Sequence, residues 1–156
     1  MHNIRERLKN LNIDLPEPAK ALGSYIPFIQ SNNLLFISGQ LPINSDGSII
    51  SGKVGEEIDA SKAQKAATQC AINIVAQANL ALENNLELIE QCLKLSGYVN
   101  SIPTFKDHPL IINAASDLIK KIFLERGIHT RIAVGCSSLP LNASVEIDAI
   151  FRIKTD

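Results

Sequence analysis

The chain contains 156 residues, which is the length of one ordinary compact domain. Hydrophobic residues make up 46% of the sequence, charged residues 20% and aromatic residues only 4%, a composition that favours a globular protein with an aliphatic core and excludes a disordered chain. Fifteen Lys and Arg residues oppose sixteen Asp and Glu residues, so the formal net charge of −1 provides no field that would attract nucleic acid or an anionic membrane. We therefore predict a single domain over residues 1–156, with neither nucleic acid nor a membrane as a partner.

The cysteines and the N-terminus indicate a compartment. Cys70, Cys92 and Cys136 are odd in number and lack metal-type spacing, and the N-terminus contains no apolar segment typical of a secretory signal. No run approaches the roughly 18 to 20 apolar residues that span a bilayer. These features favour a soluble protein of the reducing cytoplasm, in which the three thiols are small core residues rather than nucleophiles.

The N-terminal region predicts a short helix and an extended arm. Apolar residues recur at helical spacing between residues 3 and 11, and Pro16 and Pro18 prevent the helix from continuing. We assign residues 1–21 to this helix and arm, ahead of the main body of the domain.

Two β segments and a tight turn follow. Residues 25–29 and 34–38 are rich in aliphatic and aromatic side chains, and the polar residues between them predict a hairpin. Residues 44–48 contain Asp46 and Gly47, and an Asp-Gly pair supplies the positive φ that a tight turn requires.

The middle of the chain predicts a long helix and then a strand. Ser61 and Gln64 have the spacing of a capping box, and alanine-rich apolar positions then recur three and four apart as far as Leu82. Such a stripe can lie close against a sheet. Residues 86–100 predict a strand in which Gly97 marks a bulge.

The C-terminal third predicts one more helix and two strands. Asp107 is expected to cap a helix that begins near Pro109 and stops at Gly127. Residues 130–138 and 144–153 alternate between apolar and polar side chains and are the clearest strands of the chain.

The resulting order, β-β-α-β-α-β-β, predicts an α+β fold in which two helices cover one face of a mixed sheet. In the last strand, Ile147 and its alternate neighbours face the helices, whereas Glu146 faces the other side. The second sheet face mixes small, apolar and ionisable groups. Packing against another subunit explains such a face better than open water does.

Arg131 and Glu146 are the sharpest chemical signal in the sequence. If the loop between them has an even number of residues and no bulge intervenes, strand alternation places both side chains on the sheet face away from the helices. Arginine presents a planar fork that suits a carboxylate anchor, and glutamate can orient or deprotonate water. The alternative interpretation is a structural Arg–Glu ion pair at a subunit contact.

Three ordered blocks of sequence carry a further signal. They are Gly23-Ser24-Tyr25, then Ile37-Ser38-Gly39-Gln40-Leu41-Pro42, then the stretch from Arg131 through Leu139-Pro140 to Val145-Glu146-Ile147. Together they resemble the YjgF/YER057c/UK114 family, also called RidA or enamine/imine deaminases. Serine stands where the family has proline in the first block, and a weaker fourth match at residues 112–114 is one residue out of step. The resemblance covers residues 22–153 and leaves the N-terminal helix and arm as an extension, typical of a longer and more divergent branch.

The resemblance implies a chorismate-mutase-like fold and a homotrimer with clefts between neighbouring subunits. It also implies that Arg131 grips the carboxylate of a reactive 2-imino or 2-enamino acid, while Glu146 positions a water that attacks the imine carbon. Ammonia then leaves and a 2-oxo acid remains. No metal or organic cofactor is required for the chemistry that the resemblance implies.

Five further residues acquire expected roles from the same resemblance. Tyr25 and Ser38 would line the cleft, Gly39 would let the backbone approach the ligand, and Asn113 would contribute from the second helix. Their alternative interpretations are an edge-strand tyrosine, a strand-ending serine and a polar residue of the helix surface. Ala133 stands where many deaminating members have a cysteine. The family cysteine contributes chiefly through its backbone, so alanine is compatible with hydrolysis, although it removes a thiol.

Other functions compete with deamination. A non-catalytic sensor that binds small carboxylic acids through Arg131 is favoured by Ala133 and by the N-terminal extension. Endoribonuclease or translation-inhibitor activity gains little support, because the sequence has no basic stripe with interleaved aromatic residues. A chorismate mutase would want a basic cluster for its dianionic substrate, and none is visible. His129 is the only histidine near Arg131 in sequence, and we favour a non-catalytic role for it.

Overall fold

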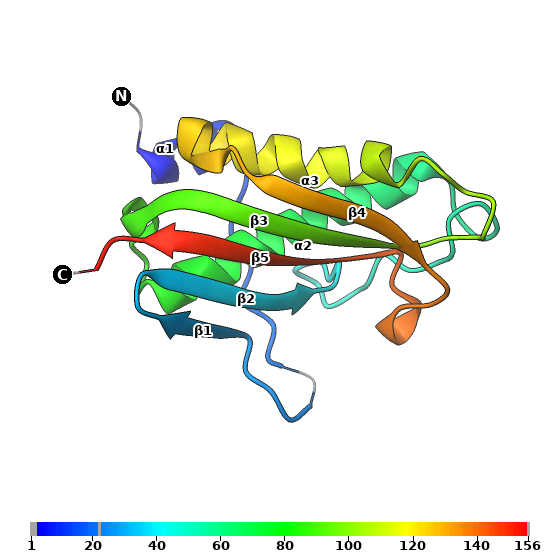
Figure 1. The fold of residues 1–156 in the computed structure, drawn as a ribbon, viewed down its shortest axis with the longest axis horizontal. Helices are drawn as coiled ribbons and strands as arrows, with labels where there is room; N and C mark the ends of the chain where they lie inside the picture. The colour runs from blue at the N-terminus through cyan, green and yellow to red at the C-terminus, as the bar shows by residue number, and fades with distance from the viewer. Residues whose placement is uncertain (1–2, 22, 156) are drawn as a thin grey trace.

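The computed structural model describes residues 3–21 and 23–155, so residues 1–2, 22 and 156 of the predicted domain lie outside the described residues (Figure 1). The elements in chain order are α1 (Ile4–Asn10), β1 (Phe28–Ser31), β2 (Leu34–Gln40), α2 (Ala60–Ala81), the 3₁₀ turn η1 (Leu86–Leu88), β3 (Ile89–Asn100), α3 (His108–Phe123), the 3₁₀ turn η2 (Leu124–Gly127), β4 (Thr130–Cys136), the 3₁₀ turn η3 (Pro140–Asn142) and β5 (Val145–Ile153). The predicted order of helices and strands is confirmed.

The strands form one mixed sheet in the order β1-β2-β5-β3-β4. Neighbouring strands are antiparallel except β3 and β4, which are connected through α3 and run parallel. Figure 1 shows α2 and α3 along the same side of the sheet, and their contacts with β2, β5, β3 and β4 place both on one face. The predicted α+β arrangement is therefore confirmed, and α1 packs against α3 as a third helix.

The start of α2 differs from the prediction. The helix begins at Ala60, and the Asp59 side chain accepts a hydrogen bond from the backbone N–H of Lys62 at 2.8 Å. Asp59 is therefore the N-cap, and the capping box predicted at Ser61 is wrong because Ser61 already lies inside the first turn. The alanines that face the sheet are fully buried, as the alanine-rich stripe predicted.

Gly97 does not mark a bulge. It pairs in regular register with Ala133 on one side and Ile147 on the other, whereas the irregularities of β3 lie at residues 89–94. A Cβ atom on Gly97 would come within 2.6 Å of the Ile112 side chain. The glycine is required because α3 packs directly on the sheet at this point.

The C-terminal end of α3 also differs from the prediction. The helix ends at Phe123, and Leu124, the first residue of η2, adopts a left-handed φ of 55°. Gly127 comes later, where an added Cβ would lie 2.6 Å from the Ile119 carbonyl oxygen. Glycine is therefore needed for the close approach of η2 to α3 rather than for capping. At the other end, Asp107 occupies the N-cap position without a side-chain capping hydrogen bond.

The β1–β2 hairpin and the tight turn agree with the sequence, with one shift. Strand β1 begins only at Phe28, so Tyr25 lies in the exposed segment before it. In the turn, Gly47 has a φ of 84° and its N–H donates to the Asn44 carbonyl at 3.0 Å.

The core lies between the sheet and the two long helices and is mainly aliphatic, as the low aromatic content predicted. Phe123 and Phe151 contribute its largest fully buried side chains, with ring centroids 5.9 Å apart. Helix α1 adds Ile4 and Leu8, which are both buried. The N-terminal extension is therefore part of the packed structure.

Two of the three cysteines belong to this core. Cys70 and Cys92 are buried; burial raises the pKa of the Cys70 thiol well above its usual value and that of Cys92 to about 12. Because the thiolate is the nucleophilic form, neither is poised for attack. Cys136 is half-buried outside the core cluster, so its predicted place in the core is wrong. Burial and the nearby Glu146 carboxylate also raise its pKa.

The described helices leave the opposite face of the sheet uncovered (Figure 1). Ile29, Ile132 and Val134 are exposed on this open face, alongside the ionisable side chains of Glu146 and Asp148. The mixture of apolar and charged groups matches the sequence pattern. No helix in the described part of the chain is both long and apolar enough to cross a membrane.

Candidate functional site

Arg131 and Glu146 lie on opposite faces of the sheet. Arg131 is paired with Leu95 of β3, whose side chain is fully buried beneath the helices. Glu146 is paired with Tyr98 of the same strand. Paired residues on neighbouring strands share a face, whereas residues three positions apart in a regular strand point to opposite faces. The prediction that both side chains lie on the face away from the helices is correct for Glu146 and wrong for Arg131.

The error arose from the order of the strands. The prediction treated the last two segments as neighbours, so that the length of the loop between them would decide which faces their side chains share. In the structure β3 lies between β4 and β5 and pairs with both of them. The register of each strand against β3 decides the faces, and within one chain Arg131 and Glu146 cannot form an ion pair.

The Arg131 side chain extends from the edge strand β4 toward α3. Its Nη1 atom donates to the Asn113 Oδ1 atom at 2.7 Å and to the Ser116 Oγ atom at 3.2 Å. Arg131 is half-buried, and a cavity of about 330 Å³ beside it is lined by Lys120 and His129 among others. Arg131 therefore contacts Asn113, which belongs to the weakest of the four sequence matches, and open space remains next to the guanidinium.

Glu146 occupies a different environment on the open face. Its carboxylate is half-buried, and burial first, then the charge of Asp148, raises its pKa above the usual value. Gly39 of β2 lies directly beside it: a Cβ on Gly39 would stand 3.0 Å from the Glu146 Cδ atom and would overlap the Oε1 atom. Because glycine has no side chain, position 39 leaves the space that the Glu146 carboxylate occupies.

A cavity of about 650 Å³ surrounds this carboxylate. Tyr25, Ser38 and Gly39 line it, together with apolar side chains of the open face. The Ser38 hydroxyl donates to the Ile26 carbonyl at 2.7 Å, so it fastens the segment that carries Tyr25 against β2. The structure thus brings together Tyr25, Ser38, Gly39 and Glu146, as expected, but keeps Arg131 and Asn113 apart from them.

Ala133 lies on β4 two residues after Arg131 and therefore shares its face. It is half-buried, pairs with Gly97 and packs against the core. Its side chain offers no polar atom, so only its backbone is available to a ligand beside Arg131.

Two residues next to Arg131 were not predicted as site residues. Ser116 contacts both the guanidinium and the Nε2 atom of His129, the latter at 2.9 Å. The sequence contained a partial signal, because His129 precedes Arg131 by two positions, just before β4, and Ser116 follows Asn113 by three positions on one helix. Only the fold shows that α3 and the segment leading into β4 lie against each other.

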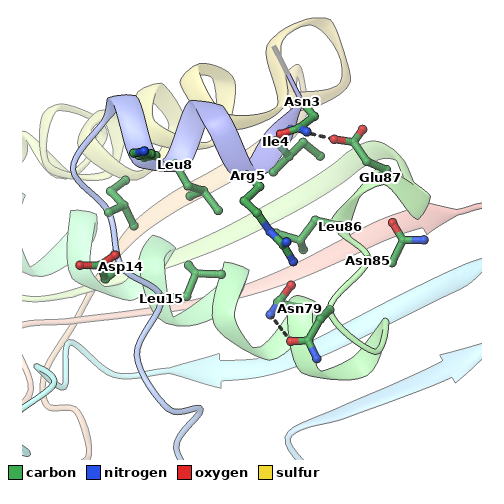
Figure 2. Close-up of a pocket in the computed structure, with 13 residues that line it drawn as sticks. Asn3, Ile4, Arg5, Leu8, Asp14, Leu15, Asn79, Asn85, Leu86 and Glu87 are labelled. Atoms are coloured by element: carbon green, nitrogen blue, oxygen red, sulfur yellow. Dashed lines mark hydrogen bonds between the residues drawn. The ribbon is translucent and has the colours of Figure 1, made fainter.

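A second large cavity, of about 630 Å³, lies between α1 and the C-terminal end of α2 (Figure 2). None of the predicted site residues lines it. Figure 2 shows the Ile4 backbone N–H directed at Glu87, whose Oε1 atom accepts it at 2.7 Å. This cavity therefore marks the seam along which the N-terminal extension docks. Among residues 3–21 and 23–155, no group of three or more His, Cys, Asp or Glu side chains is arranged to hold a metal ion.

Known proteins are similar to this chain both in sequence and in fold. The chain is 37% identical over 151 residues to Protein TCP17 of Trypanosoma cruzi, covering 96% of this chain and 94% of the relative. It is 27% identical over 143 residues to the 2-iminobutanoate/2-iminopropanoate deaminase of Dermatophagoides farinae, covering 91% and 95% respectively.

Two crystal structures show the same likeness. A protein of unknown function from Agrobacterium tumefaciens is 49% identical with a TM-score of 0.90, covering 97% of this chain and 92% of that one. A protein from Shewanella oneidensis described as a putative endoribonuclease is 30% identical with a TM-score of 0.93, covering 97% and 100%. Residues 5–151 match the family described as "YjgF/chorismate mutase-like, putative endoribonuclease". The fold is accordingly the chorismate-mutase-like α+β fold, and the chain belongs to the YjgF family.

Proposed function

We propose that the protein hydrolyses reactive 2-imino and 2-enamino acids to 2-oxo acids and ammonia, at clefts between the subunits of a homotrimer. The 2-iminobutanoate/2-iminopropanoate deaminase of Dermatophagoides farinae, to which the chain is similar along most of its length, supports this reaction class. The observation that supports the proposal is that the cation and the carboxylate expected in one site lie apart in the chain, in two incomplete half-sites. One half is a cation at a strand edge, and the other is a half-buried carboxylate with a raised pKa.

Assembly would join the two halves. Arg131 and Asn113 lie at the β4 edge of the sheet, whereas Glu146 and Gly39 lie on the open face. A head-to-tail contact brings two different patches of the same chain together, and such contacts form a closed ring when the rotation between subunits closes. In the proposed trimer, the β4 edge of one subunit covers the open face of the next, which also buries the exposed Ile132 and its apolar neighbours.

In this cleft Arg131 binds the substrate carboxylate. Both hydrogen bonds to Asn113 and Ser116 use Nη1, so the Nε and Nη2 atoms of the planar fork are left to bind a ligand. A guanidinium fixed in this way places the imine carbon at a defined distance from the facing subunit. Positioning supplies much of the rate, because an imine is already electrophilic.

Glu146 of the facing subunit activates the water. Its carboxylate accepts a proton from water as the oxygen attacks the imine carbon, and the nitrogen takes up a proton from solvent, which gives a carbinolamine. Glu146 then transfers its proton to the amino nitrogen. The C–N bond breaks and ammonia is released, while the hydroxyl proton is lost to solvent as the C=O bond of the 2-oxo acid forms. A raised pKa suits both proton transfers, because a catalytic group works best when its pKa lies near the working pH.

A coupled assay tests the proposal. An amino-acid oxidase generates the 2-imino acid in place, semicarbazide competes for it, and the protein should divert imine from the semicarbazone to the free 2-oxo acid. Arg131→Lys should raise KM, because lysine lacks the planar fork, and Glu146→Gln should lower kcat by about 10²-fold or more. Light scattering on the same samples should give the mass of three chains. A trimer that diverts no imine from any amino acid tested would overturn the proposed reaction.

A non-catalytic sensor for small carboxylic acids is the second candidate. Ala133 favours it, because this position presents no polar side chain to the ligand beside Arg131. Calorimetry with 2-oxobutyrate distinguishes the two. Tight binding that is lost in Arg131→Ala, without turnover of any imine, would favour the sensor. Salt-sensitive cleavage of RNA that disappears in Glu146→Gln would instead support the endoribonuclease named in the family description.

A further inference from the structure

A chain of three hydrogen bonds runs away from the Arg131 guanidinium into the protein. Arg131 Nη1 lies 3.2 Å from the Ser116 Oγ atom, and Ser116 Oγ lies 2.9 Å from the His129 Nε2 atom. His129 Nδ1 lies 2.7 Å from the Gly127 carbonyl oxygen. Ser116 is buried and His129 is half-buried, so these contacts are partly shielded from solvent.

The direction of each hydrogen bond follows from chemistry. A carbonyl oxygen only accepts, so the His129 Nδ1 atom carries a proton and the Nε2 atom of the neutral ring is an acceptor. The single hydroxyl proton of Ser116 must therefore point to Nε2. The lone pairs of Ser116 Oγ are then turned to Arg131, whose N–H groups only donate. Every donor in the chain has one acceptor, and the serine cannot rotate without breaking a bond.

We propose that Ser116 and His129 are positioning residues that fix the guanidinium of Arg131 in its carboxylate-binding orientation. With Asn113 alone, the guanidinium could rotate about a single hydrogen bond. Ser116, on the next turn of α3, accepts a second hydrogen bond that prevents this rotation. His129 holds the serine in the acceptor orientation. This inference rests on the proposed function, because it assigns Arg131 to a substrate carboxylate.

The charges around His129 favour the neutral imidazole ring that this arrangement of hydrogen bonds requires. Lys120 of α3 and Arg131 of β4 are both cations, and together with burial, which is the larger cause, they lower the pKa of His129. The hydrogen bond to the Gly127 carbonyl of the η2 turn opposes them and raises the pKa of His129, but the net direction is downward. Protonation at low pH would make both ring nitrogens donors and would place imidazolium and guanidinium on one serine oxygen. The orientation of Arg131 should therefore loosen as the pH falls.

The test measures binding of 2-oxobutyrate to the assembled protein by calorimetry, alongside KM and kcat for the imine. Ser116→Ala and His129→Leu should each weaken 2-oxobutyrate binding and raise KM by about 3- to 10-fold, the effect of one lost hydrogen bond, with kcat within about twofold. His129→Gln and Ser116→Thr, which keep the acceptor and the hydroxyl, should restore most of the affinity.

The chain offers a matched control. Ser101 Oγ and His108 Nε2 form a second serine–histidine contact, at 3.1 Å, that does not touch Arg131. Ser101→Ala and His108→Leu should leave 2-oxobutyrate binding unchanged. If the control variants weaken binding as much as Ser116→Ala and His129→Leu do, the positioning role is wrong.

The pH dependence provides an independent readout. The 2-oxobutyrate carboxylate stays ionised between about pH 5 and pH 8. The wild type should therefore bind it more weakly as the pH falls through the His129 pKa, and His129→Gln should show no such dependence. Tighter binding of the wild type at low pH that is absent from His129→Gln would mean that an imidazolium attracts the ligand directly, which contradicts positioning. Normal binding in the Ser116→Ala and His129→Leu variants would overturn this inference alone, whereas a wild type that neither binds 2-oxobutyrate nor diverts imine would overturn the proposed function as well.

Discussion

Gly39→Ala separates the geometry of the proposed site from the stability of the fold. Gly39 does not adopt the left-handed φ that only glycine tolerates, so alanine fits its backbone. The new Cβ would overlap the Glu146 Oε1 atom and stand 3.0 Å from its Cδ atom. What it meets is the far end of a flexible side chain, so the carboxylate would swing aside instead of the strands separating.

The size of the effect follows from that displacement. Relieving the overlap moves the carboxylate by about 1 Å, and a misplacement of this size costs up to about 10²-fold in rate. The free energy of unfolding should change little, because alanine in a strand is favoured over glycine by about 0.5–1 kcal/mol and this gain offsets the repacking of one side chain. We therefore expect kcat to fall by about 10- to 100-fold, while KM, which in the proposed trimer reflects Arg131 of the other subunit, stays within about twofold.

The coupled imine assay and thermal unfolding on the same preparation check both expectations. Unchanged kcat in Gly39→Ala would show that Glu146 does not act from its present position, and the proposed role of its carboxylate would be wrong. A large loss of thermal stability would instead show that the contact between Gly39 and Glu146 is part of rigid packing.

Three further predictions use the same preparations. Glu146→Gln should be more thermally stable than the wild type at neutral pH. The Glu146 carboxyl has a higher pKa in the folded than in the unfolded chain, so the wild type loses stability as the pH rises between these two pKa values. The glutamine variant should show no such loss in thermal unfolding measured against pH. Gly97→Ala should lower the free energy of unfolding by about 1–3 kcal/mol in denaturant titrations, because its Cβ would press on Ile112 in the core, and an unaffected midpoint would contradict the close packing of α3. Glu87→Ala should remove the acceptor of the Ile4 N–H and cost about 1 kcal/mol; hydrogen exchange should accelerate in α1 and not in β5, and equal acceleration in both would show that α1 does not detach independently.

The candidate site shows where sequence reasoning succeeded and where it stopped. Tyr25, Ser38, Gly39 and Glu146 were expected to share one cleft, and they line one cavity. Their grouping could be anticipated from the ordered motif blocks. Arg131 was expected on the same face and lies on the other, because its position depends on a parallel pairing with β3 that no local pattern encodes. The partners of Arg131 on α3 likewise depend on how a helix packs on an edge strand.

Local patterns in the amino-acid sequence were enough to predict the type and order of the elements, the aliphatic core and the buried face of the last strand. These features depend on periodicity and turn chemistry within a few residues, such as the alternation around Ile147 and the Asp46-Gly47 turn. The tertiary structure decided which strands are neighbours, and with that which face Arg131 occupies. It also decided why Gly97 must be glycine, since the reason is the side chain of Ile112 on a different element. Contacts between distant segments are chosen by the burial of the whole core, and no local pattern encodes that choice.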